Sequence, residues 1–288
     1  MRLRLLLPLL TFLAACAGDP VPPPEGPAAA AGPPPAPLGF DTFTYRDSVA
    51  LRRGGPWFTY DLRTLRATGG DPALRTRIND TLAHYLLGFA WPADSSFARG
   101  VRYAAQTAFD DYLAQPVDEG LLEESDVPYR RDEVRSTELL YRTDSLLVLA
   151  YHLYAYTGGA HGNHYTALLP FAVYPPRRLA YADLFRPDAR AELSRLLTEQ
   201  AREQDVALYV DTVPVTPNVA PLPAGVRFLY DPYAIAPYAS GEVAIDLPYA
   251  RIQGLLRPGV RKLLPGGRAG SSSEAGEAGV GPGELSSE

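Results

Sequence analysis

Two histidines near the middle of the chain are the residues best suited to metal chemistry. His161 and His164 lie in the sequence His-Gly-Asn-His, where amide and hydroxyl groups stand nearby as further ligands. A complete zinc site needs a third ligand, and neither a His-Glu-x-x-His motif nor a cysteine pair is present. Two interpretations stay open. One is a metal-dependent envelope hydrolase, and the other, which we favour, is a strand connection that His161 stabilises by hydrogen bonding to the backbone. We predict no metal and no other cofactor.

Other catalytic chemistries find no support in the residue spacing. The domain contains no Gly-x-Ser-x-Gly or Ser-x-x-Lys motif and no phosphate-binding loop. Adjacent carboxylates such as Asp110-Asp111 diverge instead of converging on a glycosidic oxygen. His84 and His152 are expected to pack within the fold. The sequence therefore predicts no catalytic residue and leaves the question of an enzyme open, with a non-enzyme favoured.

The candidate binding residues come from glycine and tyrosine. The chain has 18 tyrosines but only 2 tryptophans and one methionine, and tyrosine combines a large apolar ring with a polar tip that suits contact surfaces. Tyrosine also fills the core of β-rich domains, which is the alternative at each position. The candidates lie in a glycine turn (residues 157–162) and in a proline–tyrosine loop (residues 231–241). They are Gly158, Gly159, His161, His164, Tyr233 and Tyr238.

The N-terminus resembles a bacterial lipoprotein precursor. Two arginines and a short apolar run end in Leu13-Ala14-Ala15-Cys16, which resembles the lipobox of lipoprotein signal peptidase. Residues 1–15 are then the signal peptide, and Cys16 carries the lipid that anchors the protein to a bilayer. Cys16 is the sole cysteine, so no disulfide is expected. Ala17 permits the outer membrane, which we favour over the inner one.

Composition separates a tether and a tail from the folded part. Residues 16–38 are rich in Pro and Ala and predict an extended tether, while residues 266–288 are rich in Gly, Ser and Glu and predict a disordered acidic tail. The net charge of −6 and the isoelectric point near 5.3 argue against nucleic acid and are compatible with a cationic partner.

The N-terminal folded part, residues 39–135, begins with strands. Residues 43–51 and 57–65 have strand composition and predict a strand pair. Asp71 and Pro72 then predict a helix start. The apolar stripe of this helix contains Leu74, Ile78, Leu82, Tyr85 and Leu86. A second helix is expected over residues 94–115, with the stripe Phe97, Val101, Ala105, Phe109 and Tyr112.

The sequence of the C-terminal folded part, residues 136–265, predicts an antiparallel meander. Residues 137–156 form a β-type segment with a turn at residues 142–144, so residues 146–156 become a central strand buried on both faces. The glycine turn leads into a strand over residues 165–174.

Later elements of this part complete the predicted fold. They are a helix at residues 188–204, a proline-rich loop at 214–223, strands at 226–230 and 242–247, and a short helix at 249–256. Helices and strands come in blocks, so the fold class is α+β, with antiparallel sheets and packed helices.

Three stretches of this pattern, in order, resemble a known family. They are residues 156–162, residues 179–185 with Asp-Leu-Phe before a helix, and residues 228–241 with the core Pro-Tyr-Ala-Ile-Ala-Pro-Tyr-Ala-Ser-Gly. Together they resemble the paired extracellular domains of unknown function in the lysozyme-binding anti-sigma factors of the RsiV type and in the peptidoglycan deacetylases of the PdaC type. The resemblance covers most of residues 57–256.

The resemblance implies an α+β fold whose C-terminal half is related to a subdomain of the Hsp70-type ATPase. It also implies a lysozyme-like protein or peptidoglycan as the partner. The anti-sigma members carry a transmembrane helix before this domain and the deacetylases a catalytic domain after it, and neither is expected here. The expected function is that of a membrane-tethered, extracytoplasmic, non-catalytic binding domain. A purely structural envelope lipoprotein is the other non-enzymatic alternative.

Overall fold

The computed structural model describes residues 36–88 and 96–264, which belong to one compact unit. The predicted signal peptide, Cys16, most of the tether and the acidic tail lie outside the described residues. Within the two described ranges, no helix is both long and apolar enough to cross a bilayer.

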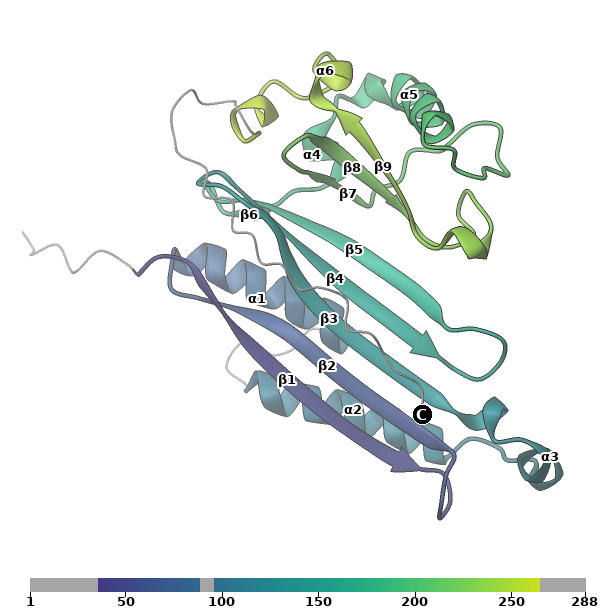
Figure 1. Ribbon diagram of the computed structural model, residues 1–288. Coiled ribbons are helices and arrows are strands. Elements are labelled where there is room, and N and C mark those ends of the chain that lie inside the picture. Colours follow the sequence, from purple (N-terminus) through teal and green to yellow (C-terminus); the bar gives the residue numbers. More distant parts are fainter. Residues whose placement is uncertain (1–35, 89–95, 265–288) are drawn as a thin grey trace, which may run out of the picture. The chain divides into compact units, whose positions relative to one another are not determined.

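Two sheets form the framework of the unit. A six-stranded sheet has its strands in sequence order, β1 to β6, and a smaller sheet contains β7, β8 and β9 (Figure 1). Strands β3, β4 and β5 form the predicted antiparallel meander. The strands are β1 (Gly39–Ala50), β2 (Trp57–Thr68), β3 (Arg131–Arg142), β4 (Leu146–Tyr156), β5 (Asn163–Ala172), β6 (Arg177–Arg178), β7 (Val219–Pro221), β8 (Gly225–Tyr230) and β9 (Val243–Pro248).

The helices lie between these strands in sequence, except for α6, which follows β9. They are α1 (Pro72–Leu87), α2 (Phe97–Leu113), α3 (Glu119–Glu124), α4 (Tyr181–Leu184), α5 (Arg190–Glu203) and α6 (Tyr249–Ile252). Short 3₁₀ turns are η1 (Val127–Tyr129), η2 (Pro187–Ala189), η3 (Tyr238–Ser240) and η4 (Val260–Lys262). The predicted α+β class is confirmed.

The first two helices follow the sequence pattern. The carboxylate of Asp71 accepts a hydrogen bond from the Leu74 amide at 2.9 Å and caps the N-terminus of α1, which ends at Gly88 with φ of +75°. The predicted stripe of α1 is buried at Leu74, Ile78, Leu82 and Leu86, while Tyr85 is only partly buried. The stripe of α2 is buried from Val101 to Tyr112, and Phe97 packs at its margin. The expected start of α2 at residue 94 lies outside the described residues.

Strands β4 and β5 are shared by two hydrophobic cores. On one face, Leu147, Leu149 and Tyr151 join the core under α1 and α2, which we call the helix-face core. On the other face, Leu146 and Val148 join a core built with the smaller sheet, which we call the second-sheet core. Side chains alternate between faces along a strand, so the apolar run of β4 supplies both cores at once. The prediction that this strand is buried on both faces is confirmed for residues 146–151, whereas residues 152–156 are only partly buried.

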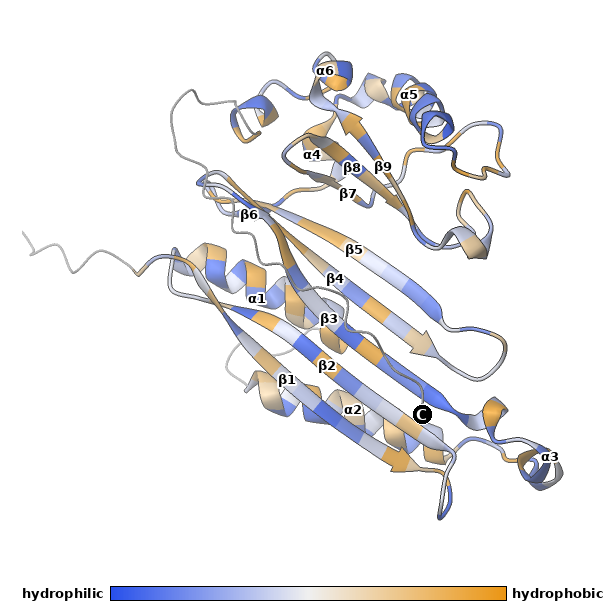
Figure 2. Cartoon of the chain, viewed as in Figure 1, coloured by the Kyte–Doolittle hydropathy of each residue, from blue (hydrophilic) through white to orange (hydrophobic). Residues whose placement is uncertain are grey.

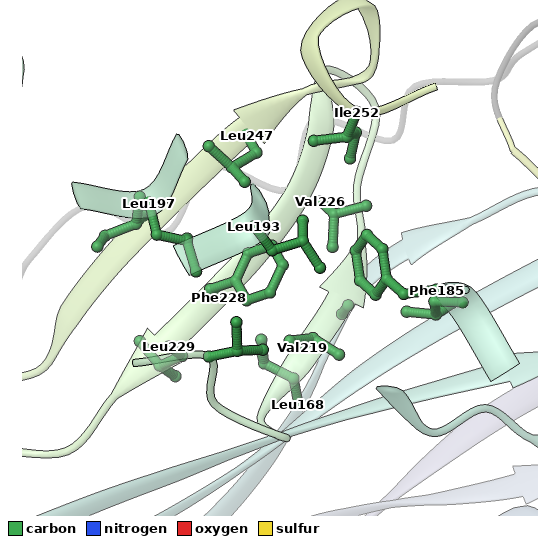
Figure 3. Close-up of a cluster of buried hydrophobic side chains, with 14 of the residues drawn as sticks. Leu168, Phe185, Leu193, Leu197, Val219, Val226, Phe228, Leu229, Leu247 and Ile252 are labelled. Carbon is green, nitrogen blue, oxygen red and sulfur yellow. The ribbon is translucent and has the colours of Figure 1, made fainter. Parts of the chain in front are cut away.

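The second-sheet core gathers residues that are distant in sequence. In Figure 3, Leu168 from β5 lies near Val219 and Phe228 of the smaller sheet, and Leu193 and Leu197 approach from α5. All of these side chains are buried. Together they hold the smaller sheet and α5 against the six-stranded sheet.

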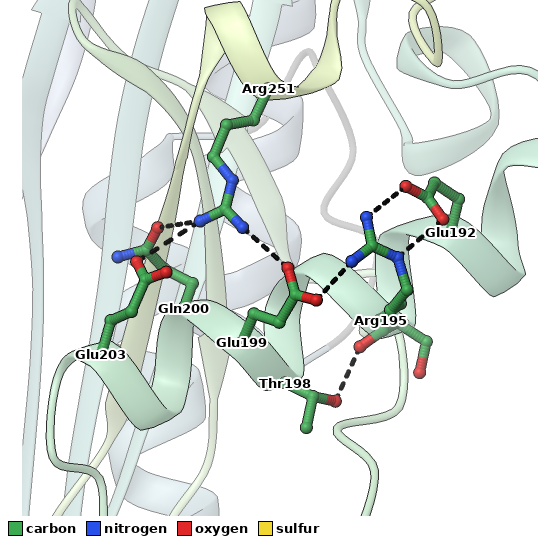
Figure 4. A network of polar contacts seen from close by, with 8 residues as sticks. Glu192, Arg195, Thr198, Glu199, Gln200, Glu203 and Arg251 are labelled. Atoms are coloured by element: carbon green, nitrogen blue, oxygen red, sulfur yellow. Dashed lines mark hydrogen bonds and ion pairs between the residues drawn. The ribbon is translucent and has the colours of Figure 1, made fainter.

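A polar network covers the outer side of α5. Arg251 of α6 reaches Glu199 at 2.9 Å and Gln200 at 3.0 Å, while Glu199 also pairs with Arg195 of the same helix (Figure 4). The carboxylates are exposed to solvent, so each pair contributes well under about 1 kcal/mol. The network orients α6 over α5 more than it stabilises the fold.

The structure departs from the sequence prediction around β3. This strand begins at Arg131, earlier than predicted, and its first half pairs in parallel with β2. Parallel pairing needs a long crossover, and α1, α2 and α3 provide it. The expected division of the folded part at residues 135 and 136 falls inside β3. The charged start of β3 has the composition of a linker, and its pairing with β2 on one side and with β4 on the other makes it a strand.

Beyond its short pairing with β6, the outer edge of β5 accepts hydrogen bonds from, and donates them to, residues outside any strand. The side-chain Oδ1 of Asn218 accepts a hydrogen bond from the Leu168 amide at 2.8 Å, and Nδ2 of the same side chain donates to the Thr166 carbonyl at 2.6 Å. Further along, the Leu179 amide donates to the carbonyl of Pro170, which itself has no N–H to offer. No described strand pairs with the outer edge of β1, at the other side of the sheet. Among the described residues, the outer edge of β5 therefore has hydrogen-bond partners, whereas that of β1 has no strand partner.

Candidate functional site

The glycine turn has a conformation that only glycine adopts easily. Gly158 and Gly159 have φ of +82° and +105°, and a Cβ at Gly158 would lie 2.5 Å from the carbonyl oxygen of Pro128. The hydroxyl of Tyr156 donates to the Gly159 carbonyl at 2.8 Å. The structure thus gives the two candidate glycines a conformational role in the turn, and His161 follows them after Ala160.

The proline–tyrosine loop is anchored at its centre and open at its tip. Ile235 and Ala236 are buried in the second-sheet core, while Tyr233 is 57% exposed. Tyr233 also has φ of +68°, a left-handed conformation that costs a non-glycine residue roughly 1–2 kcal/mol. The loop tip therefore presents an exposed ring in a backbone conformation that tyrosine rarely adopts.

The structure brings the turn and the loop together. The rings of His161 and Tyr238 stack with centroids 3.8 Å apart and an angle of 21°, and the Tyr233 ring lies 5.4 Å from Tyr238. The Tyr238 hydroxyl donates to the carbonyl of Gly162, which joins the loop to the turn. We call His161, Tyr233 and Tyr238 the His–Tyr cluster. These three residues were candidates from the sequence, and the fold places their rings next to one another.

His164 takes a different position from His161. It pairs across β4 and β5 with Tyr154, and their rings are 5.1 Å apart. Gly162 permits this packing, because a Cβ there would lie 2.3 Å from the Tyr154 ring. The Nδ1 atom of His161 lies 3.2 Å from the Gly162 carbonyl, in the backbone contact that the sequence favoured. Among the described residues, no three His, Cys, Asp or Glu side chains are grouped to hold a metal ion.

A polar chain beside the cluster was not predicted. Nε2 of His152 lies 3.0 Å from Oε1 of Glu138, and Nδ1 lies 2.9 Å from Oγ1 of Thr166. The Thr166 hydroxyl donates to Oε2 of Glu242 at 2.7 Å. We call Glu138, His152, Thr166 and Glu242 the proton chain. It crosses β3, β4 and β5 and ends on the residue that follows the proline–tyrosine loop.

The order hydroxyl, imidazole, carboxylate is also that of a hydrolase triad, but the geometry does not suit nucleophilic attack. Thr166 is only 6% exposed, and its hydroxyl hydrogen is directed at Glu242. A nucleophile needs access to a substrate carbonyl and a base that takes its hydrogen. The chain is better suited to linking the sheet to the loop.

Charge is concentrated at the loop end of the chain. The Oε1 atom of Glu242 is buried without a hydrogen-bond partner among the described residues. Burial, together with the charge of Glu242, raises the pKa of Asp231 at the start of the loop. At the other end, the hydrogen bond from His152 lowers the pKa of Glu138. Glu138 is therefore the firmly ionised end of the chain.

The uncovered part of the sheet face extends from the cluster. Strand register aligns one row across five strands, and residues directly opposite share a face. The row contains Arg46, Asp61, Val134, Tyr154 and His164. Arg46 lies 3.7 Å from Asp61, and Val134 is 42% exposed. Along β5 the residues turn from hydrophobic to hydrophilic toward the glycine turn (Figure 2). A large partner at the cluster would thus meet polar and aromatic groups.

Comparison with known proteins points to proteins of unknown function. Residues 182–250 match the model of the family described as "Protein of unknown function (DUF3298)". This segment contains Tyr233, Tyr238 and Glu242. It begins after the glycine turn, which lies outside the match. No curated protein matches the chain significantly.

Two solved structures share the fold. A DUF3298 family member from Bacteroides fragilis is 22% identical, with a TM-score of 0.67 over 77% of this chain and 95% of its own. A DUF3298 family protein from Pseudomonas aeruginosa is 21% identical, with a TM-score of 0.55 over 79% of this chain and 98% of its own. At this identity the likeness establishes the fold, and the relation to an Hsp70 subdomain stays a prediction.

Proposed function

We propose that this chain is a lipid-anchored, extracytoplasmic domain that binds a protein or a cell-wall glycan through the His–Tyr cluster, without catalysis. The observation that carries the proposal is Tyr233, an exposed ring in an unfavourable backbone conformation, stacked into a cluster by two segments distant in sequence. Rigid aromatic side chains provide contact area at a small entropy cost on binding.

A cationic, lysozyme-like protein is the sharpest partner to test. The family resemblance of the three stretches suggests it, the match of residues 182–250 to DUF3298 is compatible with it, and the net charge of −6 favours a basic partner. We expect micromolar or tighter binding of hen lysozyme to the purified domain, weakening as salt rises from 50 to 500 mM. Absence of binding at low salt would remove the lysozyme proposal. Insoluble peptidoglycan in a pull-down then tests the glycan.

The role of the cluster is tested by replacing Tyr233 with asparagine. Asn tolerates positive φ better than Tyr, so Tyr233→Asn should leave the free energy of unfolding unchanged or raise it by up to about 1 kcal/mol. The same change should weaken partner binding at least tenfold in a titration. Tyr209→Asn is the matched control, since Tyr209 is 54% exposed and lies outside the cluster. Equal affinity of the two variants would contradict the proposed site.

The anchor is tested independently of binding. Cells expressing the full chain should incorporate labelled palmitate, and Cys16→Ala should abolish the label and release the protein from the membrane fraction. Unlabelled wild-type protein in the soluble fraction would contradict the anchor and leave the binding site untouched.

A further inference from the structure

One end of the domain combines an exposed aromatic ring with arginines. The turn between β5 and β6 presents Tyr174, which is 85% exposed, more than any other large hydrophobic side chain among the described residues. Arg177 and Arg178, which form β6, follow it after two prolines. Tyrosine rings and basic side chains occur together on surfaces that lie at a lipid headgroup layer.

Further basic residues reach this end from a segment distant in sequence. Nε of Arg257 donates to the carbonyls of Ala182 and Phe185 at 2.6 and 3.1 Å, so the segment after α6 lies against α4. Arg257 and Arg177 also line one open hollow, together with residues 258–260. We call residues 177–190 and 253–264 the basic end.

The basic end keeps most of its positive charge uncompensated. Its seven basic residues and two carboxylates give a formal charge of +5, in a chain whose net charge is −6. Asp183 pairs with Arg177 at 2.6 Å, and Asp188 pairs with Arg186. No ion pair joins the other five basic residues to a carboxylate in the described part of the chain. Backbone carbonyls hold Arg257 in place without neutralising it.

The register of the sheet places the basic end where the predicted tether enters the domain. Strand β1 begins at Gly39, opposite Thr68 at the end of β2, and β2 runs parallel to β3. The end of β3 pairs with the start of β4, which pairs with the end of β5. Strand β6 pairs with that end of β5 through Arg177 and Arg178. The start of β1 and β6 therefore lie at one end of the sheet (Figure 1).

The opposite end of the sheet, which we call the far end, carries the His–Tyr cluster and negative charge. The glycine turn joins β4 to the start of β5, and the ten residues of β5 span about 30 Å. Residues 118–126, which include α3, contain five carboxylates and no basic residue. They precede η1, where Pro128 packs against Gly158 of the turn. Charges are screened over about 10 Å at 0.1 M salt, so these carboxylates do not cancel the basic end.

We propose that the basic end docks on the anionic headgroups of the membrane that holds the anchor, with Tyr174 at the headgroup layer and the His–Tyr cluster directed away from the bilayer. A tether over residues 16–38 spans up to about 70 Å, so it does not orient the domain by itself. Lipid on Cys16 raises the local concentration of the basic end near headgroups, so a weak contact suffices. The orientation rests on the proposed anchor, whereas the affinity for anionic lipid does not.

The first experiment needs no anchor. The chain from residue 17 onward, which contains all described residues, is sedimented with phosphatidylcholine vesicles that contain either no phosphatidylglycerol or about 30% of it. We expect binding to the anionic vesicles alone at about 50 mM salt, and its loss at about 500 mM. Absence of binding to anionic vesicles, or equal binding to both kinds, would overturn the proposal. Binding of soluble polyglutamate without binding of vesicles would assign the basic end to an acidic protein instead.

Charge substitutions locate the binding surface. Arg190→Gln and Lys262→Gln each remove one positive charge, and no hydrogen bond or ion pair joins either side chain to the described residues. Each should weaken binding to anionic vesicles about fivefold. Arg53→Gln is the matched control, because it removes the same charge from the exposed turn between β1 and β2, at the far end. Equal losses in the three variants would make net charge responsible and would overturn the proposed surface.

A second pair of variants tests the aromatic ring. Tyr174→Ser should weaken binding to anionic vesicles about threefold, because the ring no longer enters the headgroup layer. Tyr209→Ser is the control, since Tyr209 is 54% exposed and its amide donates to Ile235, in the proline–tyrosine loop. Equal binding by the two variants would remove Tyr174 from the docking surface.

The last experiment measures orientation. Lys262 is the only lysine of the chain, so an amine-reactive reagent reports on the basic end when the modified residue is identified by mass spectrometry. In the lipidated protein on the outer surface of vesicles, we expect Lys262 to react at least fivefold more slowly with anionic than with zwitterionic lipid. Lys262→Arg combined with Arg53→Lys moves the lysine to the far end at constant charge, and its rate should be equal on both.

Each outcome of this measurement has a separate meaning. Equal rates for Lys262 on the two kinds of vesicle, or equal protection of the lysine in the double variant, would overturn the orientation. A protein that carries no lipid would instead reject the proposed anchor, with the sedimentation result deciding the basic end.

Discussion

At the residue scale, Gly162 sets how closely the glycine turn approaches the sheet. Its missing side chain leaves room for the Tyr154 ring, and its carbonyl accepts the Tyr238 hydroxyl. Both contacts depend on the same small residue. Gly162 therefore couples the packing of Tyr154 and His164 below to the position of the His–Tyr cluster above.

We expect Gly162→Ala to destabilise the protein by about 1–3 kcal/mol, because the new methyl group would displace the Tyr154 ring from 2.3 Å. The measurement is urea unfolding at pH 7. Gly254→Ala is the control, since its Cβ would meet nothing within 4 Å and should change stability little. Equal midpoints for the two variants would show that the ring moves aside freely.

The candidate residues were only partly readable from sequence. His161, Tyr233 and Tyr238 stand out by type and by their glycine- and proline-rich surroundings. The proton chain gives no such signal, because Glu138 and Thr166 are each 14 residues from His152 and Glu242 is 76 from Thr166. Only strand register brings these common residues together, and register is a property of the folded sheet.

At the element scale, the amide of Asn218 takes the place of a strand along β5. Its two hydrogen bonds satisfy the Leu168 amide and the Thr166 carbonyl, which would otherwise face an unpaired edge. Unpaired edges invite pairing with other chains, and natural sheets protect them. The same contact ties the connection before β7 to the six-stranded sheet.

We predict that Asn218→Ala costs about 1–3 kcal/mol of stability, because two partly buried backbone groups lose their partner. Amide exchange at Leu168 should rise in the variant, as followed by NMR. Asn163→Ala provides the control, because Asn163 is an exposed residue of β5, the strand that contains Leu168. An unchanged Leu168 exchange rate would mean that water replaces the side chain without loss.

Elements with local signals were predicted well, and those set by distant partners were not. The periodic stripes and the Asp71 cap determine α1 and α2, and the apolar run determines β4. In contrast, the first half of β3 is charged and becomes a strand through antiparallel pairing with β4 and parallel pairing with β2. Such pairing depends on the chain folding back over three helices, and local propensity does not encode it.

At the scale of the whole molecule, the two cores are joined through the same two strands. Leu147 and Leu149 belong to the helix-face core, and Leu146 and Val148 to the second-sheet core. If β4 leaves the sheet, each core loses the buried side chains that β4 contributes. The two folded parts expected from sequence, residues 39–135 and 136–265, should therefore fold together.

This predicts a single cooperative unfolding transition. The methyl groups of Ile78, in the helix-face core, and Ile245, in the second-sheet core, should lose their native NMR signals at the same urea concentration. A fragment of residues 136–265 should not give native chemical shifts. Separate midpoints for Ile78 and Ile245 would reveal two independent folding units.

The double burial of β4 also has a consequence before folding is complete. Its first six residues are all buried in the native state, and the strand contains no Pro, Asp, Glu, Lys or Arg. Such segments drive intermolecular aggregation when they are exposed. Until both cores close, β4 is therefore exposed to intermolecular pairing, and mutations that delay either core should reduce the yield of soluble protein.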